Sequence, residues 1–119
     1  MAHRDNPRRF LPLTALDFQV LTVLATRELH GYGIVQASEE WLPGQPHIDI
    51  GSLYRIISRL LEDRLIREVK PPRDSPADHR VRRYYAATDL GRAVARAEAD
   101  RLRALLASPA TLRLLETER

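Results

Sequence analysis

Residues 49–63, DIGSLYRIISRLLED, carry the clearest periodic pattern of hydrophobic and polar positions in the chain. Apolar residues recur every three or four positions, as on one face of a helix, and Asp49 can cap that helix by accepting from its first backbone N–H groups. The opposite face is polar. This pattern is typical of an ordinary amphipathic surface helix or of a helix that enters a nucleic-acid groove. The apolar positions are Leu53, Ile56, Ile57, Leu60 and Leu61, and the polar ones are Ser52, Tyr54, Arg55, Ser58, Arg59 and Glu62.

Two further helices are predicted before this one. Thr14 followed by Asp17 is an N-cap signature, with Asp in place of the usual Glu or Gln, and it opens a helix over residues 15–27. Gly31 and Gly33 allow a sharp turn, after which a second helix begins at about Tyr32. Three helices with short connections, the third of them amphipathic, are the core of a helix-turn-helix.

After residue 63 the pattern becomes that of strands. Residues 65–69 and 81–88 read as two strands, and the segment between them is polar and contains three prolines. Neighbouring strand residues point to opposite faces, and we expect Tyr85 rather than Tyr84 to face the core. The predicted fold class is mainly α with a two-stranded β wing, which is a winged helix-turn-helix.

A last helix is predicted to begin after Thr88, and its interrupted apolar stripe needs a cover. A second copy of the chain can supply it in a two-fold dimer, whereas the alternative is that the helix folds back on its own domain. We therefore predict a flexible basic arm at 1–10, a winged helix-turn-helix domain at 11–88, and a C-terminal dimerisation helix with a tail at 89–119. The predicted dimer contacts are Leu90, Val94, Ala97, Leu102, Leu105 and Leu106.

Composition and charge narrow the class of protein. The 119 residues fit one domain, and the absence of cysteine excludes disulfides and thiolate metal sites. No apolar run approaches the roughly 20 residues that span a bilayer, and we expect a cytoplasmic protein without membrane contact. The net charge of +3 is uneven, since residues 11–63 carry −4 and residues 64–83 carry +4. A basic wing can straddle a phosphate backbone.

Catalysis is not indicated by the sequence. The four histidines are scattered, with no pair at metal-ligand spacing. No serine lies in a nucleophile-elbow context, and there is no phosphate-cradling glycine loop. We therefore predict a protein that is not an enzyme and has no catalytic residue, metal or cofactor.

Five short motifs fall at the turns, helix starts and strands assigned above: His30-Gly31-Tyr32, GSLYR at 51–55, Leu65-Ile66, RYY at 83–85 and TDLG at 88–91. Together they resemble the PadR family of bacterial transcriptional regulators over about residues 13–106. The resemblance implies a homodimer that binds a pseudo-palindromic operator in double-stranded DNA, usually as a repressor, with the terminal helix at the dimer contact. Some members of that family respond to small aromatic or drug-like molecules, which implies a small-molecule effector as a further partner.

One position departs from the pattern of that family. Similar proteins usually have glycine where this chain has Arg64, just past the third helix. A left-handed conformation there costs a non-glycine residue on the order of 1 kcal/mol. We therefore expect either that the helix ends differently or that Arg64 adds a phosphate contact.

Each candidate DNA-binding residue has a predicted role. Gly51 lets the helix N-terminus approach the DNA backbone, Arg55 and Arg59 read base edges, and the wing arginines add salt-dependent affinity. Ser52 and Tyr54 donate to phosphates, and Tyr32 adds a phosphate contact from the second helix. An alternative for Arg59 is an ion pair with Glu62 or Asp63 on its own helix. The rival function is a winged helix that binds another protein and no DNA. The candidate residues are Tyr32, Gly51, Ser52, Tyr54, Arg55, Arg59, Arg80, Arg82 and Arg83.

Overall fold

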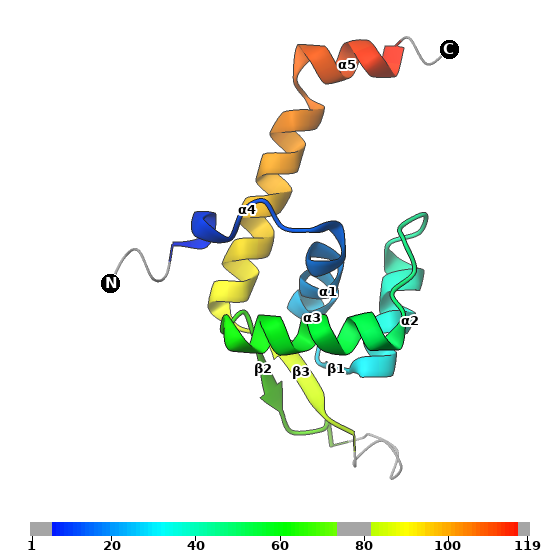
Figure 1. The fold of residues 1–119 in the computed structure, drawn as a ribbon, viewed down its shortest axis with the longest axis vertical. Coiled ribbons are helices and arrows are strands. Elements are labelled where there is room, and N and C mark those ends of the chain that lie inside the picture. Colours follow the sequence, from blue (N-terminus) through cyan, green and yellow to red (C-terminus); the bar gives the residue numbers. More distant parts are fainter. Residues whose placement is uncertain (1–5, 74–81, 117–119) are drawn as a thin grey trace.

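The computed structural model describes residues 6–73 and 82–116 of the chain. It confirms the predicted fold class, because the chain is mainly helical and carries a small antiparallel sheet (Figure 1). In chain order the elements are the 3-10 helix η1 (Pro7–Phe10), α1 (Ala15–Thr26), β1 (Leu29–His30), α2 (Gly31–Trp41), α3 (Ile50–Glu62), β2 (Ile66–Val69), β3 (Tyr84–Ala87), α4 (Asp89–Leu106) and α5 (Pro109–Glu116).

Helix α1 lies at the centre of the fold. Its residues Val20, Leu21, Val23 and Leu24 are at most 1% exposed, and they belong to the main hydrophobic core. Helices α2 and α4 and strand β3 all pack against α1. A helix that is apolar around most of its circumference has to be covered on several sides, which explains its central position.

The sheet has three strands in the order β1-β3-β2, one strand more than the predicted wing. Leu29 and His30 of β1 pair with Tyr85 and Tyr84 of β3, so the segment predicted as a turn also adds an edge strand. The core position of Tyr85 is confirmed. Tyr84 is buried as well, because its ring packs edge-on against the imidazole of His30 with centroids 5.2 Å apart.

Helix α3 ends in a Schellman turn. Arg64 has a φ of 61°, which is left-handed, so the helix ends as it would with glycine there, and the expectation of a different ending is wrong. The backbone N–H of Leu65 donates to the carbonyl of Leu60 (2.9 Å), and that of Arg64 donates to the carbonyl of Leu61 (3.0 Å). The two bonds satisfy carbonyls at the helix end and offset the conformational cost of a non-glycine residue at position 64.

The start of α4 is fastened to this turn. The Thr88 hydroxyl donates to the carbonyl of Arg64 (2.7 Å) and accepts from the backbone N–H of Gly91 (3.0 Å). The backbone N–H of Thr88 donates to the carbonyl of Leu65 (3.0 Å). A Cβ at Gly91 would lie 1.9 Å from that same carbonyl oxygen, so the close approach of the two segments requires glycine.

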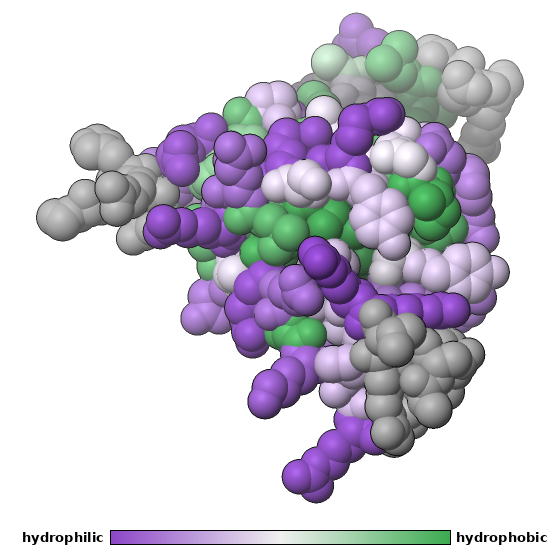
Figure 2. Space-filling model, turned by 60° about the horizontal axis from the view of Figure 1, so that its bottom comes forward, coloured by the Kyte–Doolittle hydropathy of each residue, from purple (hydrophilic) through white to green (hydrophobic). Residues whose placement is uncertain are grey.

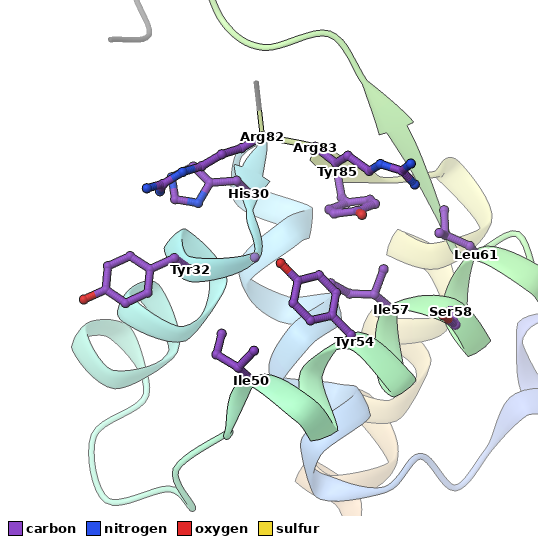
Figure 3. A pocket seen from close by; sticks show the side chains of 11 residues that line it. His30, Tyr32, Ile50, Tyr54, Ile57, Ser58, Leu61, Arg82, Arg83 and Tyr85 are labelled. Atoms are coloured by element: carbon purple, nitrogen blue, oxygen red, sulfur yellow. The ribbon is translucent and has the colours of Figure 1, made fainter. Parts of the chain in front are cut away.

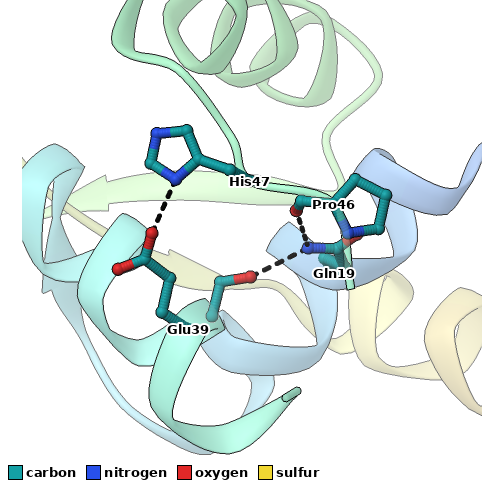
Figure 4. A network of polar contacts seen from close by, with 5 residues as sticks. Gln19, Glu39, Pro46 and His47 are labelled. Atoms are coloured by element: carbon teal, nitrogen blue, oxygen red, sulfur yellow. Dashed lines mark hydrogen bonds and ion pairs between the residues drawn. The ribbon is translucent and has the colours of Figure 1, made fainter. Parts of the chain in front are cut away.

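Side chains of α1 and α2 hold the loop that leads into α3 (Figure 4). Nε2 of Gln19 donates to Oγ of Ser38 (2.9 Å) and to the carbonyl of Pro46 (3.3 Å). Nδ1 of His47 lies at hydrogen-bonding distance, 2.6 Å, from Oε2 of Glu39. These bonds fix where α3 begins relative to the two helices before it.

The predicted flexible arm at residues 1–10 requires a correction. Residues 7–10 form η1, which packs against α4, while residues 1–5 lie outside the described residues. Phe10 and Leu11 pack against the hydrophobic core, and this apolar contact is the physical reason that the segment is ordered.

A buried carboxylate of α4 connects this helix to the segment just before α1. Glu98 is 2% exposed and accepts two hydrogen bonds of 2.8 Å from the guanidinium of Arg101. These bonds, together with one from the backbone N–H of Leu13, hold the pKa of Glu98 below its ordinary value. The carboxylate therefore stays charged although it is buried.

Beyond α4, the chain continues as helix α5. Ser108 caps it, since its Oγ accepts from the backbone N–H of Thr111 (3.2 Å). Helix α5 lies at the end of α4 that is far from the sheet (Figure 1), and it contains no buried residue. Among the described residues, no helix is long and apolar enough to cross a membrane.

We expect Gly91→Ala to destabilise the fold by about 1–3 kcal/mol or more, because the new methyl group overlaps the carbonyl of Leu65. Urea unfolding at 25 °C measures the change. Gly33→Ala is the matched control, since its Cβ would meet no atom closer than 3.4 Å and alanine favours the helix. Equal stability of the two variants would contradict the proposed constraint at Gly91.

Candidate nucleic-acid interface

The exposed face of α3 begins at a well-bonded N-cap. The carboxylate of Asp49 accepts from the backbone N–H and from the hydroxyl of Ser52, both at 2.9 Å. These two hydrogen bonds lower the pKa of Asp49 below its ordinary value of 3.8. The cap predicted from the sequence is therefore confirmed. Ser52 is a predicted phosphate donor, but in this structure its hydroxyl donates to the Asp49 carboxylate instead.

Arg55 lies one turn further along the same face. Its Nη2 donates to Oγ of Ser52 at 3.3 Å, a long hydrogen bond to a neutral group. The side chain is exposed. The guanidinium can therefore exchange this partner for a base edge or a phosphate at low cost.

Gly51 has open space where its side chain would be. A Cβ built there would meet only Oδ1 of Asp49, at 3.4 Å. The chain's own packing therefore does not require glycine at this position. The missing side chain instead leaves the first turn of α3 open, and the close approach of this turn to a DNA backbone stays a prediction.

A cleft of about 580 Å³ separates α3 from the sheet (Figure 3). Tyr32 reaches it from α2, Tyr54 from α3, and Arg82 and Arg83 from the segment before β3. The two tyrosines are half exposed, at 55% and 50%. Four of the predicted DNA-binding residues, separated by up to 51 positions in the chain, thus line one cleft with hydroxyl and guanidinium donors.

Three residues outside the predicted set also shape this cleft. The imidazole of His30 caps α2 by accepting from the backbone N–H of Gly33 (3.0 Å), and its Nε2 lies 3.4 Å from Nη1 of Arg82. A Cβ at Gly31 would lie 2.8 Å from the hydroxyl of Tyr54, so glycine makes room for that side chain.

Tyr85 is the third of these residues, since it lines the cleft as well as the core. Burial raises the pKa of Tyr85, and the nearby charge of Glu68 acts in the same direction, so the hydroxyl remains a neutral donor. The sequence alone does not mark His30 or Tyr85 as a site residue, because histidine is an uncommon N-cap and a tyrosine in a strand is an ordinary core residue.

Arg59 is bound to a carboxylate of another helix. Its Nη2 donates to Oδ1 of Asp17 in the first turn of α1. The Asp17 side chain is 10% exposed and that of Arg59 is 49% exposed. The alternative partners on α3, Glu62 and Asp63, are not the ones that the structure shows.

The face that carries these residues is mostly hydrophilic, with a smaller hydrophobic patch at its middle (Figure 2). Arg80 lies outside the described residues, so its predicted place at the base of the wing is not addressed. Among the described residues, no three His, Asp or Glu side chains come together as a metal site. The hydrogen-bond donors and cations of this face, among them Arg55, Arg82 and Arg83, suit an anionic polymer.

Comparison with protein families gives one match. Residues 20–97 match the model of the transcriptional regulator PadR-like family, which covers more than half of the chain. Among curated proteins, none matches this sequence.

Several solved structures share the fold. A PadR-like transcriptional regulator from Bacillus cereus is 20% identical with a TM-score of 0.67, over 87% of this chain and 93% of that one. A PadR family transcription regulator from Clostridium difficile is 21% identical with a TM-score of 0.65, over 77% and 91%. PadR of Bacillus subtilis in complex with operator DNA is 21% identical with a TM-score of 0.56, over 75% and 47%. At these identities the similarity shows the fold alone.

The lowered pKa of Asp49 predicts how the α3 cap responds to acid. A depressed carboxyl pKa contributes stability above its ordinary value of 3.8, and this contribution is lost as the pH falls through the lowered value. Asn also caps helices but does not titrate, so Asp49→Asn should lose less thermal stability than the wild type between pH 7 and pH 3. Thermal midpoints at both pH values measure this difference, and parallel losses would contradict the assignment.

Proposed function

Since the chain belongs to the PadR-like family of transcriptional regulators, which are not enzymes, we propose that it represses transcription by binding duplex DNA sequence-specifically. The resemblance read from the five motifs is thereby confirmed. In this proposal the protein acts in the cytoplasm, as a homodimer on a pseudo-palindromic operator, and a small aromatic or drug-like effector relieves repression.

The observation that carries the proposal is the meeting of four donor side chains in one cleft beside the exposed face of α3. Tyr32, Tyr54, Arg82 and Arg83 come from three parts of the fold and line the same hollow. The open first turn at Gly51 lies on the same helix. In a winged helix-turn-helix, the third helix enters the major groove and flanking groups contact phosphates.

The roles of the residues follow from their partners. Arg55 has only a weak bond to give up and is the candidate for reading a guanine edge. Tyr32, Tyr54, Arg82 and Arg83 contact phosphates in the proposal, and Arg83 contributes salt-dependent affinity for any sequence. Arg59 is held by Asp17, and the proposal therefore gives it no base-reading role.

The proposed dimer uses the far part of α4. Leu105 and Leu106 are 52% and 57% exposed, and Leu102 is half-buried at the same end of the helix. Exposed leucines of α5 follow directly, which favours a continuous apolar surface there. Val94 is 0% exposed within its own chain and so offers no surface to a second copy, and Leu90 packs against the chain's own core. Ala97, also predicted at the interface, is half-buried and lies between these two groups.

The proposed effector has a candidate site. A hollow of about 660 Å³, within the usual range for small-molecule sites, lies between α1, the loop after α2 and α4. Its lining is mostly apolar and includes Phe18, Leu42, Pro43 and Leu102. A molecule bound there would contact both the loop that leads to α3 and the helix of the proposed dimer contact.

Fluorescence anisotropy tests the DNA binding directly. One duplex carries the sequence upstream of the protein's own gene and the other is scrambled, and both are titrated at 50 and 200 mM salt. We expect tighter binding to the upstream duplex, with affinity falling as salt rises. Binding to neither duplex would favour the rival function, a winged helix that binds another protein.

We expect Arg55→Ala and Arg83→Ala to differ in kind. Loss of a base contact should weaken specific binding by about 1–3 kcal/mol and relax discrimination at one base pair. Loss of a phosphate contact should weaken binding to all sequences alike and flatten the salt slope by about 0.9. Anisotropy on both duplexes over a salt series measures these effects. If the two variants changed both duplexes equally, the division of roles would be wrong.

We expect Leu105→Asp to convert the dimer into a monomer, because a carboxylate would be buried without a partner in the proposed interface. Sedimentation velocity measures the change at low micromolar concentration. Leu61→Asp makes the same change on α3, where Leu61 is 37% exposed, and it should leave the dimer intact. A monomeric wild type, or an unchanged profile for Leu105→Asp, would count against this interface.

A further inference from the structure

We propose that Asp17 limits the affinity of the protein for DNA of any sequence: by holding Arg59 in an ion pair, it keeps this guanidinium from pairing with phosphates. The inference rests on the DNA binding proposed above and deepens it. It starts from the hydrogen bond that joins the last turn of α3 to the first turn of α1.

The two partners of this ion pair differ in burial. The Asp17 side chain is 10% exposed, whereas that of Arg59 is 49% exposed. The carboxylate is therefore fixed by the packing of α1, and the guanidinium is the partner that can move. If Arg59 left for a phosphate, a nearly buried carboxylate would lose its partner, which is strongly unfavourable. The pair therefore resists exchange with phosphates at the surface.

The position of Arg59 makes this restraint matter for DNA. Arg59 lines the same shallow hollow on α3 as Gly51, Tyr54 and Arg55. An unrestrained arginine on this face would neutralise one more phosphate and add affinity that does not depend on sequence. Such a contact would strengthen binding to every sequence alike, so the ion pair lowers the affinity for DNA in general and leaves the preference between sequences unchanged.

The two arginines of α3 are thus distinguished by their partners. Arg55 is held by the neutral hydroxyl of Ser52 at 3.3 Å, a bond that is easily exchanged. Arg59 is held by a charged and nearly buried oxygen. Breaking the first bond leaves only an exposed hydroxyl, which water can satisfy, whereas breaking the second leaves a nearly buried carboxylate unpaired, so the fold leaves Arg55 available to DNA and withholds Arg59.

The test compares Asp17→Asn with Glu62→Gln by anisotropy on the upstream and scrambled duplexes over a salt series. Both substitutions remove one carboxylate near the DNA face, but among the described residues Glu62 forms no ion pair. We expect Asp17→Asn to steepen the salt slope on scrambled DNA by about 0.9 relative to Glu62→Gln. With this change in slope, the affinity of Asp17→Asn relative to that of Glu62→Gln rises on the order of threefold when the salt concentration falls from 200 to 50 mM. The gain should be the same on both duplexes, so the preference for the upstream duplex should stay unchanged.

Arg59→Gln supplies a second measurement that does not depend on the folding of Asp17→Asn. Because Arg59 contacts no phosphate in the wild type under this proposal, Arg59→Gln alone should leave the salt slope unchanged. In the double variant Asp17→Asn/Arg59→Gln, the steeper salt slope of Asp17→Asn should disappear.

The proposal is overturned if Asp17→Asn behaves like Glu62→Gln, or if Arg59→Gln alone flattens the slope by about 0.9. The second result would mean that Asp17 presents Arg59 to DNA. A wild type that binds neither duplex would instead refute the proposed function, and the inference with it.

Discussion

The carbonyl of Leu65 is the point on which the placement of the wing, α3 and α4 depends. It accepts the backbone N–H of Thr88, and the first turn of α4 passes so close that a Cβ at Gly91 would overlap it. Backbone contacts of this kind leave little room for rotation, because no flexible side chain lies between the two segments. Arg64, with its left-handed backbone conformation, connects the end of α3 directly to Leu65. The orientation of α3 relative to α4 is therefore set by the main chain.

A second connection runs through α1. This helix packs against α4 on one side, donates from Gln19 to the loop before α3, and binds Arg59 of α3 through Asp17. A change at the proposed dimer helix therefore has two physical routes to the proposed DNA face. One passes through the turn at Leu65, and the other passes through α1. The hollow lined by Phe18 and Leu42 lies against the second route.

Local signals in the sequence were enough for the main helices and strands. The spacing of Leu53, Ile57 and Leu60 and the caps at Asp49 and Thr88 each act within a few residues, and the structure confirms them. What the sequence did not reveal depends on partners far apart in the chain. Strand β1 exists only because it pairs with β3, η1 is ordered by packing on α4, and Asp17 lies 42 residues from Arg59. No local pattern encodes such pairings, although the Asp in place of Glu at position 17 is a weak sign of another use for that carboxylate.

The central position of α1 also has a consequence for the order in which the molecule opens. Amide hydrogens in its buried middle, around Leu21 and Leu24, exchange with solvent only when helices on several sides separate, which amounts to global unfolding. Helix α5 has no buried residue, so its amide hydrogens exchange through local fraying. Among the described residues, hydrogen exchange should therefore be much slower in the middle of α1 than in α5.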